Sequence, residues 1–217
     1  MNYQDLNKDT LINVLIKKDK ILRKLYIEQK KLSYYANTDD MTGVLNRRSG
    51  LELLNKELNL SKIKNKNIVV CFVDVDRLKM INDSFGHAEG DKALIKVAEI
   101  LRESISKSNF VIRMGGDEFL VVFPETTMKE VNKTWYKICR NVEEANEGID
   151  NYNLSLSYGF YEYSKEIQKE LSINDLIKKA DEEMYKKKMK KKGVIRIQEY
   201  KNSKYKLLRK AVEYGRT

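Results

Sequence analysis

Four acidic residues stand where apolar runs end, and they are the first candidates for chemistry. Asp74 and Asp76 close the run "IVVCFVDVD", and Asp117 and Glu118 follow two glycines in "RMGGDEF". On an ideal strand, Asp74 and Asp76 project from the same face. Because burying an unpaired carboxylate costs several kcal/mol, two acidic clusters at the ends of buried strands indicate that cations lie between them.

The chemistry of these ligands narrows the choice of metal. Carboxylate oxygens with no His or Cys nearby favour Mg²⁺ or Mn²⁺ over zinc. Mg²⁺ held by one or two carboxylates usually completes its shell with substrate phosphates and water, so the pattern indicates phosphoryl or nucleotidyl transfer. The same residues also fit a structural hairpin whose acids face the solvent, and their types alone leave both interpretations open.

The segment between the two clusters offers groups that can bind a nucleotide. Lys79 supplies a point charge for phosphate, and Asn82 and Asp91 form a possible base reader. A carboxylate accepts two hydrogen bonds from the ring N–H and the exocyclic amine of guanine, a pattern that adenine does not present. Gly86 and Gly90 would let a backbone approach a ligand closely.

The elements that must position these residues follow from the hydrophobic periodicity. A helical period runs through Leu51, Leu54 and Leu58. We expect strands at 67–76, in two parts of 109–123, at 153–164 and at 194–198, and further helices at 86–104, 128–147 and 173–192. This order, β-α-ββ-α-β-α-β after an initial helix, predicts an α+β sandwich related to the ferredoxin-like arrangement.

The N-terminal residues 1–36 contain no Gly or Pro and carry a 4-3 spacing typical of a coiled coil. The seam consists of Leu11, Leu15, Lys18, Leu22, Leu25, Gln29 and Leu32. It predicts a dimerisation helix of roughly three heptads. A single amphipathic helix that packs back on its own domain is the alternative.

Composition places the chain among globular proteins. Its 217 residues are 41% hydrophobic and 34% charged, which suits one domain with a short extension. The longest apolar run, "IVVCFV", is far shorter than the roughly twenty residues that span a bilayer, and no secretory signal precedes it. Cys71 and Cys139 have no metal-type spacing, so we expect reduced thiols in a cytoplasmic protein.

The net charge of +10 is concentrated in "KKKMKKK" at 186–192 and in the tail 201–217. Such a charge attracts polyanions, whether nucleic acid, anionic lipid or nucleotide phosphates. A solvated helix face explains a lysine run equally well. Nucleic-acid binding as the main role rests on charge alone, and we do not expect it.

Three stretches together indicate a family. "TDDMTGVLNRR", "DVDRLKMINDSFGHAEGD" and "RMGGDEF" occur in this order, and the chain from about Asp39 to Ile197 resembles the GGDEF family of diguanylate cyclases. The resemblance implies a palm-type GGDEF domain with a central, mostly antiparallel sheet flanked by helices. We therefore expect an N-terminal signalling helix at 1–36, the catalytic domain at 37–198 and a basic tail at 199–217.

The resemblance also implies a two-metal site with two Mg²⁺ (or Mn²⁺) ions. Asp74 would bind metal through its side chain and Val75 through its carbonyl oxygen. Asp117 and Glu118 would complete the site, and one of them would help to deprotonate the attacking hydroxyl. Asp76 would be structural.

A further set of residues is implied to bind the substrate GTP. Asn82 and Asp91 would read guanine, and His87, which alone reads as a turn or capping residue, would lie beside the nucleotide. The residues expected near the phosphates are Lys79, Gly115, Gly116, Lys188 and Lys192.

The implied reaction condenses two GTP molecules into cyclic di-GMP and releases two pyrophosphates. Each 3′-hydroxyl attacks the other nucleotide's α-phosphorus, so two loaded subunits of a homodimer must face each other. A regulatory partner could act at the N-terminal helix. Two alternatives remain: a catalytically weak domain that serves as a GTP-binding or dimerisation module, and a cyclase whose product contains adenine.

The sequence departs from the family pattern at two places. Ser106 and Asn109 stand where many members carry the Arg and Asp of an inhibitory product site, so we expect no strong product inhibition there. Lys191 and Lys192 replace a Gly-Arg pair near the C-terminus. A lysine neutralises phosphate without a planar fork, which predicts weaker GTP binding or slower turnover.

Overall fold

The computed structural model describes residues 8–164 and 171–191. In chain order the elements are α1 (Lys8–Asn37), α2 (Arg47–Lys64), β1 (Ile68–Val75), α3 (Leu78–Phe85), α4 (His87–Ser104), β2 (Phe110–Gly115), β3 (Glu118–Pro124), α5 (Met128–Asn146), β4 (Leu156–Tyr163) and α6 (Ile173–Lys191). The strand expected at 194–198 and the tail 199–217 lie outside the described residues.

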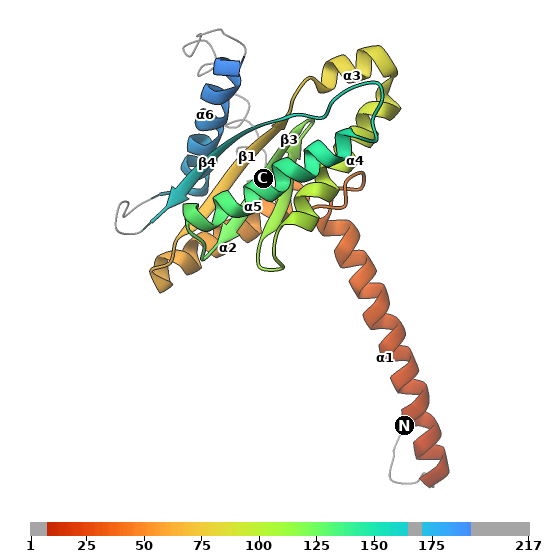
Figure 1. Ribbon diagram of the computed structural model, residues 1–217. Helices are drawn as coiled ribbons and strands as arrows, with labels where there is room; N and C mark the ends of the chain where they lie inside the picture. Colours follow the sequence, from red (N-terminus) through yellow and green to blue (C-terminus); the bar gives the residue numbers. More distant parts are fainter. Residues whose placement is uncertain (1–7, 165–170, 192–217) are drawn as a thin grey trace, which may run out of the picture.

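The described strands form one sheet in the order β2-β3-β1-β4, and every neighbouring pair is antiparallel. β1 lies inside the sheet, and all of its residues are buried. A strand covered on both faces needs apolar side chains on both, which explains the continuous run "IVVCFV". The predicted α+β fold, with an antiparallel sheet flanked by helices, is confirmed (Figure 1).

Two hydrophobic cores lie on the two faces of the sheet. Alternate residues of β1 enter each core: Val69, Cys71 and Val73 pack with α4 and α5, whereas Val70 and Phe72 pack with α2 and α6. The period of two along a strand produces this division. It also places the side chain of an even-numbered β1 residue on the α6 side of the sheet.

The sequence did not predict α3. This helix follows Arg77, whose φ of 61° is left-handed, and it ends at Gly86, whose φ is 86°. Its Asn, Asp and Ser residues favour turns over helices, but Leu78 and Ile81 are buried and hold the helix against the core. Burial therefore outweighs the local preference.

Helix α1 is 30 residues long, and none of its residues is buried. It projects away from the sheet and its covering helices (Figure 1). The alternative in which this helix packs back on its own domain is therefore wrong. None of the helices in the described ranges is long and apolar enough to cross a membrane.

Candidate active site

The acidic residues of the two clusters come together at one end of the central strands. Asp74 of β1 pairs with Glu118 of β3 across the ladder, so their side chains lie on the same face of the sheet. Asp74 is only 7% exposed. Directly opposed carboxylates repel each other, so this end of the sheet needs a positive charge.

Lys188 of α6 supplies part of that charge. Its Nζ lies 2.5 Å from Oδ1 of Asp74. Burial raises the pKa of the Asp74 carboxyl above its usual value; the Lys188 ion pair opposes this shift, and the charges of Asp117 and Asp76 add to it. The structure thus joins the expected metal ligand to the expected phosphate-binding lysine.

Asp76 is bound in a different way. Its two carboxylate oxygens accept hydrogen bonds from the hydroxyls of Ser155 (2.7 Å) and Ser157 (2.6 Å). These bonds tie the end of β1 to the start of β4. They occupy both oxygens of Asp76, as a structural role requires.

The glycine turn joins β2 to β3 and lies beside the acids. Gly115 and Gly116 have φ values of 143° and 53°, and both are exposed. A Cβ at either position would have no described atom within 4 Å, so the space above the turn is open to a ligand. The carbonyl of Asp117 accepts a hydrogen bond from the amide of Val75 (3.0 Å), which fixes the turn to the end of β1.

Arg113 supports this turn, and sequence reasoning did not assign it a role. Its Nε and Nη2 donate to the carbonyl of Gly116 (3.3 and 3.0 Å), and its Nη1 donates to Oδ1 of Asp39 (2.9 Å). Asp39 follows the end of α1 and also accepts hydrogen bonds from the backbone and hydroxyl of Thr42. Both residues lie in the stretches that carry the family resemblance, but their pairing is visible only in three dimensions.

The expected guanine readers lie at the junction of α3 and α4. Asn82 is half-buried, and a Cβ at buried Gly90 would collide with its amide. Gly90 therefore gives room to the Asn82 side chain, where we expected room for a ligand. Asp91 is the next residue of α4 and is exposed, as are His87 and Lys79.

The carboxylates of Asp74, Asp117 and Glu118 fit a hard divalent cation whose remaining ligands come from outside the protein. Asp74 and Glu118 are cross-strand neighbours, and Asp117 is close enough to shift the pKa of Asp74. In the part of the chain that the structure describes, no three His, Cys, Asp or Glu side chains converge as a ready-made metal site. Phosphate and water oxygens would thus have to complete the shell, as Mg²⁺ prefers.

Of the two departures from the family pattern, the first lies among the described residues, and the expectation of weak product inhibition stays a prediction. Ser106 and Asn109 lie in a tight turn, where the amide of Asn109 donates to the carbonyl of Ser106 (3.0 Å). The hydroxyl of Ser106 lies 2.9 Å from that of Ser108. Lys192 lies outside the described residues, so its expected contact with phosphate stays a prediction.

Comparison with known proteins identifies the family. Residues 36–193 match the family model described as "Diguanylate cyclase, GGDEF domain". The chain is 32% identical over 180 residues to the diguanylate cyclase DgcP of Escherichia coli K12, which covers 82% of this chain and 52% of DgcP. The chain thus spans about half the length of that relative.

Solved structures show the same fold. The GGDEF domain of DgcB from Caulobacter crescentus, in complex with c-di-GMP, has a TM-score of 0.64 and 26% identity, covering 73% of this chain and 89% of that one. The coiled coil and GGDEF domain of DgcB has a TM-score of 0.70 and 23% identity, covering 85% and 95%. With its sheet, glycine turn and paired acids, the chain belongs to the GGDEF-domain diguanylate cyclase family.

Proposed function

We propose that the protein condenses two GTP molecules into cyclic di-GMP and two pyrophosphates. The observation that carries the proposal is the nearly buried Asp74, which lies across from Glu118 beside an open glycine turn. Two divalent cations, Mg²⁺ or Mn²⁺, would bind at Asp74, the Val75 carbonyl, Asp117 and Glu118. They would neutralise the phosphates and favour ionisation of the attacking hydroxyl.

The chain's own groups would hold and orient the nucleotide. Asn82 and Asp91 would bind the guanine edge, and the exposed turn would let the α-phosphate approach the acids. Lys188 would exchange its bond to Asp74 for a phosphate oxygen, since an ammonium is a point charge that can serve either partner. Asp117 or Glu118 would accept the proton of the 3′-hydroxyl.

Each bond-forming step is an exchange at phosphorus. The 3′-oxygen of one nucleotide forms a bond to the α-phosphorus of the other, the bond to the bridging oxygen breaks, and pyrophosphate leaves. Two such steps close the ring. Because one site holds one GTP, a homodimer must bring two sites together, and α1 would set how often they meet or would receive a regulatory partner.

The test is product analysis by chromatography and mass spectrometry after incubation of the protein with GTP and Mg²⁺. We expect cyclic di-GMP from the wild type and none from Asp117→Ala or Glu118→Ala. Glu103→Ala, which removes an exposed acid of α4, should leave the product yield unchanged. GTP binding without product would instead favour a binding or dimerisation module.

A further inference from the structure

Two neighbouring lysines near the end of α6 bind different partners beside β4, the edge strand of the described sheet. The Nζ of Lys188 forms the ion pair with Asp74. The Nζ of Lys187 lies 4.5 Å from the ring centroid of Tyr158 and 5.4 Å from that of Phe160. Because adjacent residues of a helix do not share a face, the two side chains diverge and reach separate sites.

The partners of the two lysines lie on opposite faces of the sheet. Tyr158 and Phe160 pack against the core that contains residues of α4 and α5, whereas the side chain of Asp74 lies on the α6 side. Burial raises the pKa of the Cys71 thiol in that same α4–α5 core, and the charge of Lys187 opposes this shift. The Lys187 ammonium is therefore close to the face of the sheet that α6 does not cover.

The two rings beneath Lys187 form a fixed support. Tyr158 and Phe160 stand edge to face, with centroids 5.4 Å apart and ring planes at 64°. The indole of Trp135, which is only 3% exposed, packs against these rings at centroid distances of 4.5 and 5.2 Å. Aromatic faces attract a cation, and the buried indole keeps these two faces in place for the ammonium.

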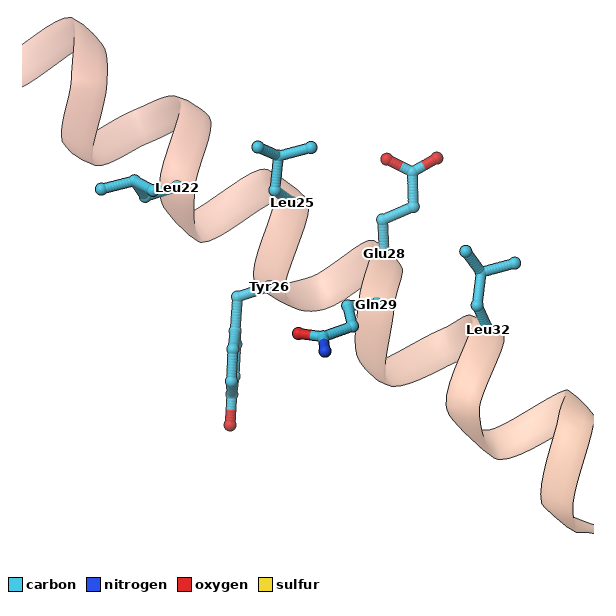
Figure 2. Close-up of a pocket in the computed structure, with 6 residues that line it drawn as sticks. All are labelled: Leu22, Leu25, Tyr26, Glu28, Gln29 and Leu32. Atoms are coloured by element: carbon cyan, nitrogen blue, oxygen red, sulfur yellow. The ribbon is translucent and has the colours of Figure 1, made fainter.

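A lysine on α1 provides a contrast. The Nζ of Lys30 lies 5.5 Å from the ring centroid of Tyr26, and Tyr26 is 60% exposed. Figure 2 shows this ring projecting away from the helix, at a hollow on its surface. The contact joins two residues that are four positions apart on one helix, so it positions no other element. The Lys187 contact differs because it joins α6 to a strand of the sheet.

The middle of α6 is held by its backbone, and its end is held by side chains. A Cβ at Gly159 of β4 would collide with backbone atoms of Ala180 and Met184, so the helix lies directly on the strand there. Lys187 and Lys188 come three and four residues after Met184, near the end of α6, where helices fray. A contact at Lys187 thus limits the directions that the next side chain can take.

We propose that Lys187 is a positioning residue whose ammonium, held over two aromatic rings, fixes the end of α6. It thereby keeps Lys188 at Asp74 and, with substrate bound, at the phosphates of GTP. Lys187 acts only through its neighbour. The effect on GTP rests on the proposed function, whereas the placement of Lys188 can be measured without any nucleotide.

Acetylation with acetic anhydride in the nucleotide-free full chain measures how firmly Lys188 is held. The Lys188 side chain is 20% exposed and that of Lys186 is 51% exposed, so mass spectrometry should find slower acetylation at Lys188. Lys187→Met keeps the length of the side chain and removes its charge. We expect it to raise the acetylation rate of Lys188 about fivefold. An unchanged rate at Lys188 would overturn the proposal.

Three further variants act as controls for the acetylation rate of Lys188. Lys187→Arg should keep the wild-type rate, because a guanidinium also lies over aromatic faces. Lys186→Met removes an exposed charge of the same helical turn, which pairs with Glu183 at 2.6 Å, and should leave the rate unchanged. Lys30→Met removes the exposed contact on α1 and should also leave it unchanged. A rise in Lys187→Arg or Lys186→Met as large as in Lys187→Met would overturn the role of the rings.

Steady-state kinetics with GTP and Mg²⁺ separate positioning from general stability. Lys187→Met should raise the KM for GTP about fivefold with a smaller change in kcat, since Lys188 would contact phosphate in the bound substrate. In a Lys188→Met background, Lys187→Met should have no further effect, because no ammonium is left to position. An equal rise in KM in both backgrounds would overturn the proposal. If GTP were never converted, the acetylation results would still stand, so failure of the proposed function would be distinguishable.

Discussion

Asp74 carries a negative charge that costs stability and that the proposed chemistry needs. Its carboxyl is nearly buried, and its pKa is raised chiefly by that burial. A raised pKa in the folded state means that the folded protein holds this proton more tightly than the unfolded chain does. Asp74 therefore lowers the free energy of unfolding as the pH rises through its raised pKa.

The Asp74→Asn substitution should thus separate stability from activity. Without metal, we expect the Asp74→Asn protein to have a higher melting temperature than the wild type at pH 7. This difference in melting temperature should shrink as the pH falls toward 3.8, the ordinary pKa of an Asp carboxyl. Product formation should fall by at least about a hundredfold, since Asp74 is a proposed metal ligand. A lower melting temperature at pH 7 would contradict this account of Asp74.

Gly90 is predicted to act through its neighbour Asn82. A Cβ at this position collides with the Asn82 amide, so Gly90→Ala should displace that side chain. We expect the KM for GTP to rise about tenfold, equivalent to about 1.4 kcal/mol, with a smaller change in kcat. In an Asn82→Ala background, Gly90→Ala should have little further effect. An equal rise in KM in both backgrounds would mean that Gly90→Ala acts by disturbing helix α4 and not through Asn82.

At the scale of single residues, the sequence indicates which residues are candidates for the site better than it indicates their contacts. The acids and the glycine turn could be picked out because their types are costly or unusual beside apolar runs, whereas Asn82 and Asp91 were picked out as a possible reader of guanine. The bond between Asp74 and Lys188 joins residues 114 positions apart, and no local pattern predicts it.

The glycine turn and the end of α1 are mechanically linked through one arginine. The Arg113–Asp39 pair is mostly buried, with side chains 12% and 25% exposed. Burial alone raises the pKa of the Asp39 carboxyl, but hydrogen bonds from Thr42 and Arg113 outweigh it and hold the pKa below its usual value. The stability that Asp39 contributes is therefore present above pH 3.8 and lost as the pH falls through its lowered pKa.

Arg113→Ala should remove three hydrogen bonds from the link between the turn and Asp39. We expect the free energy of unfolding to fall by about 1–3 kcal/mol and turnover to fall more than about tenfold, measured well below the melting temperature. Arg140→Ala breaks an exposed ion pair with Glu144 on α5 and should cost less than about 0.5 kcal/mol. Wild-type turnover in a folded Arg113→Ala protein would show that the turn holds its shape without this support.

The elements themselves were largely predictable, and the exception has a physical reason. β1 and the β2–β3 hairpin follow from apolar runs interrupted by glycine, whose left-handed φ values the turn requires. β4 begins at Leu156, later than the expected 153, because the residues before it bind other parts of the chain. The hydroxyl of Ser155 donates to Asp76, and the amide of Leu154 donates to the side chain of Asn146. α3 was missed because its polar residues resemble a loop, and only the packing of Leu78 and Ile81 makes it a helix.

At the scale of the molecule, one feature dominates: a GGDEF domain at the end of a long uncovered helix (Figure 1). The seam predicts pairing with a second copy, and its leucine spacing fits either direction of pairing. The proposed activity requires two GTP-loaded sites to meet, so it depends on assembly as well as on the site.

The measurement that tests the account most directly is the rate of cyclic di-GMP formation as a function of protein concentration, with saturating GTP and Mg²⁺. The account predicts cyclic di-GMP as the product and a rate per subunit that rises with concentration before it levels off. GTP that binds but yields no cyclic di-GMP at any concentration would contradict the proposed function. A rate per subunit that stays constant down to concentrations where the protein is monomeric would contradict catalysis between two subunits.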